Sequence, residues 1–292
     1  MNRWSNCGLR GNKSLRKTRF LPAVSILAFL AGCAGLPSDH VQFDGLSNCP
    51  KQTAATLAAK QSQLGPLSDT HTLACALTVL RNTQDTAVRR TALGSRLCLH
   101  LAEREANQQK REKLAAEGGS FAEAALAQGG GDGAVHYYLA VNLGLAVREH
   151  ITLAMENLGR LEGEMKQAEA LNPDIDDGGP LRILGTLYLK APAWPNGIGD
   201  RDKALELLRK AVKEHPGHPL NHLFYAQALW DEDDETVLPQ VKAEFALGQK
   251  LLAEGNWGYS KAPWKKEFND FQQEFGEAGS SARKQPLTQA LK

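Results

Sequence analysis

The sequence predicts an all-α protein built from helical hairpins, preceded by a secretory signal peptide. Three observations support this fold class. Apolar residues recur at helical spacing from residue 51 to 128 and again beyond residue 133. No stretch alternates apolar and polar residues as a half-buried strand would, and one helical unit recurs along the chain. Together these patterns favour an α-solenoid, in which stacked hairpins bury a continuous core.

The first 32 residues have the features of a bacterial signal peptide. Six basic residues and no acid occupy the first 19 positions, and an apolar run from Phe20 to Leu30 follows. That run is shorter than the roughly 20 residues of a membrane-spanning helix. The ending Leu30-Ala31-Gly32-Cys33 resembles the lipobox of bacterial lipoproteins. The resemblance implies cleavage before Cys33, a diacylglycerol thioether on its sulfur and an acyl chain such as palmitate on its amino terminus.

This segment leads us to expect a lipid-anchored protein on the periplasmic side of a bacterial membrane. Several acyl chains anchor a protein stably, where a single chain binds only marginally. By resemblance to lipoprotein sorting in enteric bacteria, Ala34 in place of Asp favours the outer membrane. An ordinary signal peptide followed by an unrelated cysteine is the alternative interpretation.

Charge argues against nucleic acid as a partner. The whole chain has a net charge of +1, but its first 32 residues hold six positive charges and no negative one, so residues 33–292 carry −5. Nucleic-acid binding needs a clustered basic surface, and a periplasmic location argues against it further.

Composition divides the mature chain into four parts. Residues 33–48 contain Gly, Pro, Ser and Asp without periodicity and are expected to form a tether. Residues 49–128 form an Ala- and Leu-rich helical region, 129–275 hold the helical repeats, and 276–292 form a disordered tail. Asp132, after a run of glycines, is a candidate helix N-cap.

Three cysteines remain in the body of the chain. Cys75 and Cys98 lie in consecutive helical segments, where a bridge between the two helices is geometrically plausible. Cys49 precedes the first helix and is able to pair with either. An oxidising compartment favours one disulfide, whereas buried free thiols remain the alternative for the two helical cysteines.

The repeat is clearest between Leu181 and Pro216. Leu181, Leu184, Gly185 and Tyr188 follow the spacing W-x2-L-G-x2-Y of the tetratricopeptide unit, with Leu in place of Trp. Small residues at Gly185 and Ala204 are expected to let two antiparallel helices approach closely, and Pro216 closes the unit. Gly144 is expected to make the same contact in the preceding unit.

The central unit contains an insertion. Gly144, Gly185 and Ala226 follow one another at intervals of 41 residues, against about 34 in a standard unit. The excess falls between Tyr188 and Ala204, in a segment that holds Trp194 between two prolines. We expect Trp194 either to line a ligand or partner interface or to seal the core between units.

Few residue patterns in this sequence indicate a catalytic or metal site. His215, His218 and His222 form H-x2-H-x3-H, but prolines interrupt it and no carboxylate or Cys is spaced with it, so turn and helix-start histidines are favoured over a metal site. No nucleophile elbow, zinc-protease, phosphate-loop or dinucleotide motif is present. We therefore expect no enzyme, no cofactor and no metal.

The chain resembles the T-component (TatT) family of lipoproteins that accompany TRAP-type transporters. Besides the lipobox, the residues that carry this resemblance are Gly178, Gly179, Arg182, Gly185, Tyr188, Pro192, Gly199, Asp200, Lys203, Ala204 and Pro216. The resemblance covers residues 135–252. It implies a trimer with a central pore and hydrophobic clefts beside a periplasmic solute-binding protein. We expect Arg182, Tyr188 and Trp194 to be ligand- or partner-binding residues.

Three functions are weighed from these observations. The first is a lipid-anchored binding or scaffold component that assists a solute-binding protein or holds an apolar ligand. The second is a general outer-membrane tetratricopeptide lipoprotein that docks assembly factors. An enzyme is the third. An apolar cavity lined by the repeats would favour the first function, and a long open groove without a cavity would favour the second.

Overall fold

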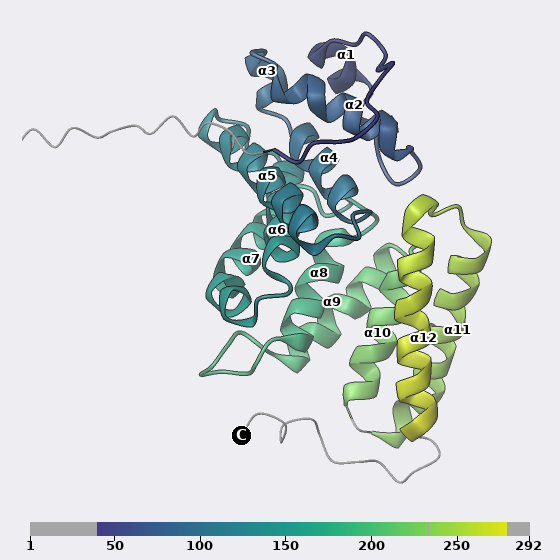
Figure 1. Ribbon diagram of the computed structural model, residues 1–292. Helices are drawn as coiled ribbons and strands as arrows, with labels where there is room; N and C mark the ends of the chain where they lie inside the picture. The colour runs from purple at the N-terminus through teal and green to yellow at the C-terminus, as the bar shows by residue number, and fades with distance from the viewer. Residues whose placement is uncertain (1–39, 233, 279–292) are drawn as a thin grey trace, which may run out of the picture. The chain divides into compact units, whose positions relative to one another are not determined.

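The computed structural model describes residues 40–232 and 234–278, and this part of the chain is all-helical (Figure 1). The α-helices are α1 (Ala54–Ala59), α2 (Thr70–Arg81), α3 (Thr86–Arg89), α4 (Leu93–Ala102), α5 (Gln108–Ala127), α6 (Gly133–Val147), α7 (Ile151–Leu171), α8 (Gly179–Lys190), α9 (Arg201–Glu214), α10 (Pro219–Asp231), α11 (Leu238–Glu254) and α12 (Lys261–Ala278). The signal peptide, Cys33 and residues 279–292 of the expected tail lie outside the described residues. No helix among the described residues has the length and apolarity needed to cross a membrane.

Side-chain caps explain where many of the helices begin. The carboxylate of Asp132 accepts a hydrogen bond from the Val135 amide at 2.9 Å, which confirms it as the N-cap of α6. Asp69 caps α2 by accepting from the Thr72 amide, and Asp200 caps α9 by accepting from the Lys203 amide. These short polar side chains satisfy amides that the first helical turn leaves without partners.

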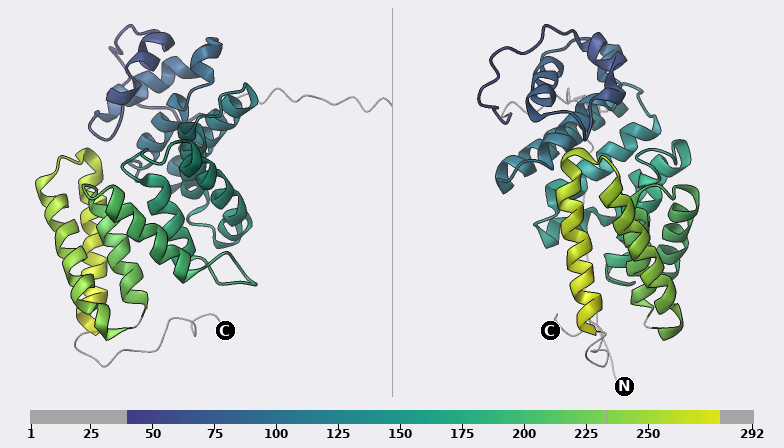
Figure 2. Two further views of the ribbon diagram at one scale, coloured as in Figure 1. Left: turned by 180° about the vertical axis from the view of Figure 1, so that it is seen from behind. Right: turned by 90° about the vertical axis from the view of Figure 1, so that its right-hand side faces the viewer.

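Neighbouring helices pack in pairs. α4 lies against α5, α6 against α7, α8 against α9, and α10 against α11. Some even-numbered helices also touch one another, as α2 with α4, α4 with α6, α8 with α10, and α10 with α12, and α7 with α8 joins the two halves of the series. Figure 2 shows these helices from behind and from the side.

Small residues allow the two helices of a pair to approach closely, although only one of the two glycines expected to do so lies at such a contact. A Cβ on Gly185 would lie 2.5 Å from Leu208 Cγ, so the close contact between α8 and α9 requires glycine. A Cβ on Gly144 would meet only Leu161 Cδ2, at 3.6 Å, which is an ordinary contact. The expected tight contact at Gly144 was therefore wrong. Ala204 is fully buried, whereas Pro216 is exposed two residues beyond the end of α9.

A buried amide joins the first helical pairs. Asn142 on α6 is completely buried, and its Nδ2 donates to the backbone oxygens of Ser95 at 2.9 Å and Tyr138 at 2.8 Å. Gly118 on α5 makes room for it, since a Cβ there would meet Asn142 Oδ1 at 2.4 Å. This polar contact in an apolar core fixes the relative positions of α4, α5 and α6.

Residues 40–48 pack on the body, unlike the tether expected for 33–48. Val41 is buried, and its carbonyl accepts from Arg81, whose guanidinium also forms a two-point ion pair with the buried Glu117 at 2.8 Å. A disulfide joins Cys49 to Cys75, while Cys98 is a buried free thiol. The open choice among the cysteines is thus resolved in favour of Cys49 with Cys75. These contacts fasten residues 40–49 to α2 and α5.

At the other end of the described chain, α12 extends to Ala278 and so includes the first three residues of the expected tail, 276–292.

A candidate ligand-binding groove

A groove of about 570 Å³ runs along the even-numbered helices. Its lining residues are Glu103, Arg111, Arg148, Thr186, Lys190, Leu220, Phe224, Gln227, Tyr259, Ser260, Pro263, Trp264, Glu267, Asp270, Phe271 and Glu274. Three helices, α8, α10 and α12, each contribute a stripe of residues. Thr186 and Lys190 of α8 are four residues apart, and Leu220, Phe224 and Gln227 of α10 follow at steps of four and three. Such spacing places side chains on one helix face, so the groove is a property of the stacked helices rather than of a loop.

Aromatic side chains form the apolar part of the groove. Phe224, Trp264 and Phe271 line it from α10 and α12. The Trp264 ring packs on Trp257 at 5.4 Å and on the His218 imidazole at 5.0 Å between ring centroids. Partly buried aromatic rings supply large apolar area in few orientations, which suits them to hold an apolar group.

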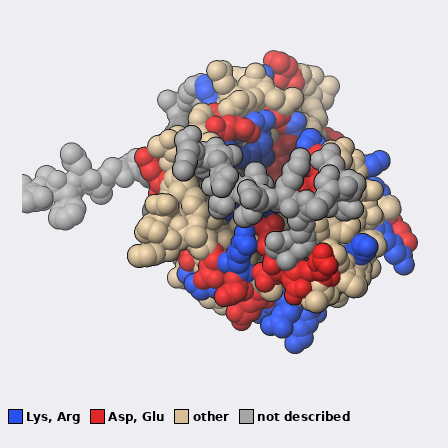
Figure 3. Space-filling model, turned by 90° about the horizontal axis from the view of Figure 1, so that it is seen from below, with Lys and Arg blue, Asp and Glu red and all other residues tan. Residues whose placement is uncertain are grey.

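Charged residues make up nearly half of the lining. The α12 stripe carries Glu267, Asp270 and Glu274, while Arg111, Arg148 and Lys190 come from α5, the end of α6 and α8. Figure 3 shows acidic and basic groups interspersed on the face seen from below, without one continuous basic patch on its described surface. A ligand with both an apolar part and ionised groups fits this lining better than a wholly apolar one.

One end of the groove is closed by a contact between distant parts of the chain. Tyr259, in the short 3-10 helix Gly258–Ser260, lies under the Arg104 guanidinium at 4.1 Å and donates its hydroxyl hydrogen bond to Glu103. Its amide also donates to the Pro66 carbonyl at 3.3 Å. Burial raises the pKa of Tyr259, and the negative charge of Glu103 raises it further, so the hydroxyl stays protonated. Tyr259 and Glu103, which are 156 positions apart in the sequence, are thus held together in the groove lining.

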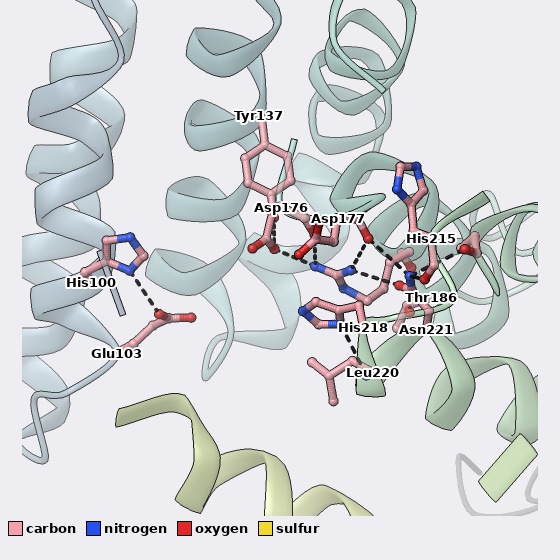
Figure 4. Close-up of polar contacts among 12 residues, drawn as sticks. His100, Glu103, Tyr137, Asp176, Asp177, Thr186, His215, His218, Leu220 and Asn221 are labelled. Atoms are coloured by element: carbon pink, nitrogen blue, oxygen red, sulfur yellow. Dashed lines mark hydrogen bonds and ion pairs between the residues drawn. The ribbon is translucent and has the colours of Figure 1, made fainter. Parts of the chain in front are cut away.

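His218 supports the wall behind Trp264. It is buried, forms the N-cap of α10, and its Nδ1 accepts from the Leu220 amide at 3.3 Å (Figure 4). Burial, followed by the positive charges of Arg182 and His222, lowers the pKa of His218 to about 2. The imidazole of His218 is therefore neutral in the folded protein.

The other two histidines of the H-x2-H-x3-H run also have structural partners. Burial lowers the pKa of His222, but its bonds to Glu244 at 2.7 Å and to the Pro216 carbonyl at 2.8 Å outweigh this effect, so that pKa lies above its ordinary value. His215 lies 3.6 Å from Asp174. Each of the three histidines therefore contacts a different partner.

Arg182 lies inside the fold, away from the groove lining. Its guanidinium donates to Asn221 Oδ1 at 2.9 Å, to the Asp176 carboxylate at 2.5 Å, and to the carbonyls of Asp176 and Asp177. Asp176, Asp177 and Asn221 are drawn in Figure 4. These contacts hold the turn between α7 and α8 against α10. The placement differs from the expected ligand-binding role, since every hydrogen bond named here is internal.

Tyr188 and Trp194 also lie away from the groove lining. Tyr188 is buried, and its hydroxyl donates to Glu162 of α7 at 2.5 Å. Trp194 is 84% exposed in the loop between α8 and α9, which projects from the body at the lower left of Figure 1. Exposure excludes the core-sealing interpretation of Trp194. None of the three residues expected to bind a ligand or partner belongs to the groove lining.

Two groove residues, Trp264 and Phe271, belong to a run of aromatic residues that the sequence shows between positions 257 and 275. Thr186 and Lys190 were not predicted, because the repeat pattern on α8 marks Gly185 and Tyr188, which pack inward. Neither a protein-family model nor a curated protein matches this chain.

Proposed function

We propose that this protein is a lipid-anchored, tetratricopeptide-like binding component that holds an amphipathic ligand in its groove and assists a periplasmic solute-binding protein. The observation that carries the proposal is the groove itself, whose stripes come from α8, α10 and α12. In a tetratricopeptide stack the first helix of each hairpin faces the concave side, which is the face that binds. The pairing of α4 with α5, α6 with α7, α8 with α9 and α10 with α11 supports such a stack.

The anchor is proposed from the sequence. The Leu30-Ala31-Gly32-Cys33 ending after a basic segment supports lipidation of Cys33. Only six residues separate Cys33 from His40, where the described body begins. A lipid anchor at Cys33 would hold the protein at a membrane, which suits delivery to, or receipt from, a partner at the same membrane.

The chemistry of the groove lining indicates the class of ligand. The aromatic rings of Phe224, Trp264 and Phe271 suit an apolar segment, while Lys190 and the acidic stripe of α12 suit ionised groups. This proposal modifies the expectation of a wholly apolar ligand. The resemblance to T-component lipoproteins supports the solute-binding partner and the trimer, and no catalytic step is assigned to the groove.

The exposed Trp194 favours a second candidate function, a docking protein for assembly factors. Its loop is tightly built, since a Cβ on Gly199 would meet the Ala191 carbonyl at 2.1 Å and the Gly199 amide donates to the Pro192 carbonyl at 2.8 Å. A tightly built loop that presents a large aromatic ring is suited to contact another protein.

The ligand assignment is tested by mass spectrometry of small molecules that co-purify with the full-length protein. Phe224→Ala removes a groove ring and is expected to lose the co-purified compound. Leu247→Ala, at a 42% exposed position outside the groove lining, serves as the matched control and should retain it. Equal amounts of compound in both variants would contradict the proposal.

A further inference from the structure

A second site lies away from the groove, where three ligand-bearing side chains meet beside α2. The Cys49 and Cys75 sulfurs and a ring nitrogen of His71 all lie within 4.8 Å of one another. Cys75 Sγ is 3.7 Å from His71 Nε2 and 3.8 Å from His71 Nδ1. The first helical turn explains half of this arrangement, because residues four apart on α2 share one face.

The loop before α1 supplies the third side chain in a fixed position. Asn48 adopts a left-handed backbone conformation, with φ of 70°, immediately before Cys49. The Ser47 carbonyl lies 3.3 Å from His71 Nε2, so loop and helix are also joined beside the sulfur pair. In the structure the two cysteines form a disulfide, which holds their sulfurs together beside the His71 ring.

We propose that Cys49, His71 and Cys75 form a redox-gated site for a thiophilic cation, Zn²⁺ or Cu⁺. The disulfide is the closed state. Reduction by a dithiol reductant takes two electrons and two protons, breaks the S–S bond and yields two thiols, while the reductant becomes a disulfide. Binding of the cation then releases both thiol protons, because thiolate is the coordinating form.

The donor set and its accessibility select this class of ion. Two thiolates with one imidazole match the soft and borderline ions that Cys and His hold in proteins, and disfavour Mg²⁺ and Ca²⁺, which take oxygen donors. His71 is exposed and Cys49 is half-buried, so an ion reaches the site from solvent, whereas Cys75 is buried and fixed by α2. Three protein donors leave room for one further ligand from solvent.

Oxidation state therefore decides whether the site binds a metal ion. The same sulfurs cannot form a disulfide and coordinate a cation, so reduction opens the site and oxidation expels the ion. Cys98, the free thiol of α4, is buried elsewhere in the core and is absent from this cluster. The inference stands independently of the groove and of its ligand.

The test uses Co²⁺ as a spectroscopic probe of the full-length protein, reduced with a phosphine under anaerobic conditions. One equivalent of Co²⁺ should produce a thiolate-to-cobalt charge-transfer band, Zn²⁺ should abolish it, and the oxidised protein should show none. His71→Ala, which leaves both sulfurs intact, should weaken the Zn²⁺ affinity by more than about 100-fold, because loss of a second-shell partner alone costs about 10–100-fold. Cys49→Ser should abolish the charge-transfer band.

Cys98→Ala is the matched control and should bind as the parent protein does. Circular dichroism of each reduced variant reports whether the helices persist. The proposal is overturned if the reduced parent gives no charge-transfer band, whether folded or unfolded. It is also overturned if the band and affinity survive His71→Ala, or if Cys98→Ala removes them.

Discussion

Gly185 shows how one absent side chain sets the distance between two helices. Because a Cβ there would lie 2.5 Å from Leu208 Cγ, Gly185→Leu forces α8 and α9 apart. Overpacking of this kind costs about 1–3 kcal/mol. We expect the free energy of unfolding in urea to fall by that amount.

Gly144→Ala provides the matched comparison for Gly185. The 3.6 Å to Leu161 Cδ2 leaves room for a methyl group, and replacing a mid-helix glycine with alanine removes a helix penalty of roughly 0.5–1 kcal/mol. Stability should therefore stay unchanged or rise slightly. An unfolding midpoint unaltered by Gly185→Leu would contradict the close contact.

Protonation of His218 is expected to make the free energy of unfolding depend on pH. In the unfolded chain this histidine binds a proton below about pH 6.5, whereas its folded pKa is about 2. Its contribution to stability is therefore fully present above pH 6.5 and is lost as the pH falls, with a slope of about 1.4 kcal/mol per pH unit. His222, whose pKa is raised, contributes in the opposite sense and loses its contribution as the pH rises.

We expect His218→Asn to reduce the loss of stability at low pH. Asparagine keeps an N-cap acceptor at the start of α10 but does not titrate. Between pH 7.5 and pH 5 the parent protein should lose about 2 kcal/mol more than the variant. Urea unfolding at the two pH values measures this difference. Identical pH dependence in both proteins would show that His218 does not remain neutral in the fold.

The limits of prediction at the residue level follow from helix geometry. Gly185 and the cap Asp132 were predicted because their sequence signals are local. Arg182 was assigned to ligand binding because nothing in the sequence shows that Asn221, 39 positions later, would bond to its guanidinium. Long-range polar partners of this kind become visible only once the helices are stacked.

Among the elements, the loop between α8 and α9 makes the clearest prediction. Trp194 is 84% exposed, so Trp194→Ala should change the free energy of unfolding by less than about 0.5 kcal/mol. A role in recognition requires that partner capture is lost at the same time. Capture of a cross-linked periplasmic protein by the parent and by the variant tests this role. Undiminished capture, with an unchanged melt, would exclude the loop as a docking element.

The all-α fold class was predictable because the 3.6-residue period persists through most of the chain. The insertion around Trp194 was predictable because the central repeat is longer than a standard unit. The packing of residues 40–48 was not predictable, because it depends on the Arg81–Glu117 pair and on a disulfide whose partners the spacing left open. The groove was anticipated only as a generic cleft. Its charged residues were not predicted, because they come from α5, α8, α12 and the ends of α4 and α6, which only the stacked helices bring together.

Considered as a whole, the molecule brings its last hairpin back to its first helices. Tyr259 near the start of α12 contacts Arg104 and Pro66, so the groove is bounded by elements from both ends of the described chain. In the proposed function, lipidation of Cys33 tethers the protein that carries this groove to a membrane.

Site-specific photocrosslinking in bacterial cells tests the groove most directly. A photoreactive phenylalanine analogue at Gln227 would lie in the groove, and the same analogue at the exposed Lys213 of α9 would lie outside its lining. Our account predicts that position 227 crosslinks a discrete small molecule or periplasmic solute-binding protein while position 213 does not. Crosslinks to the same species from position 213, with none from position 227, would contradict the assignment of the groove as the binding site.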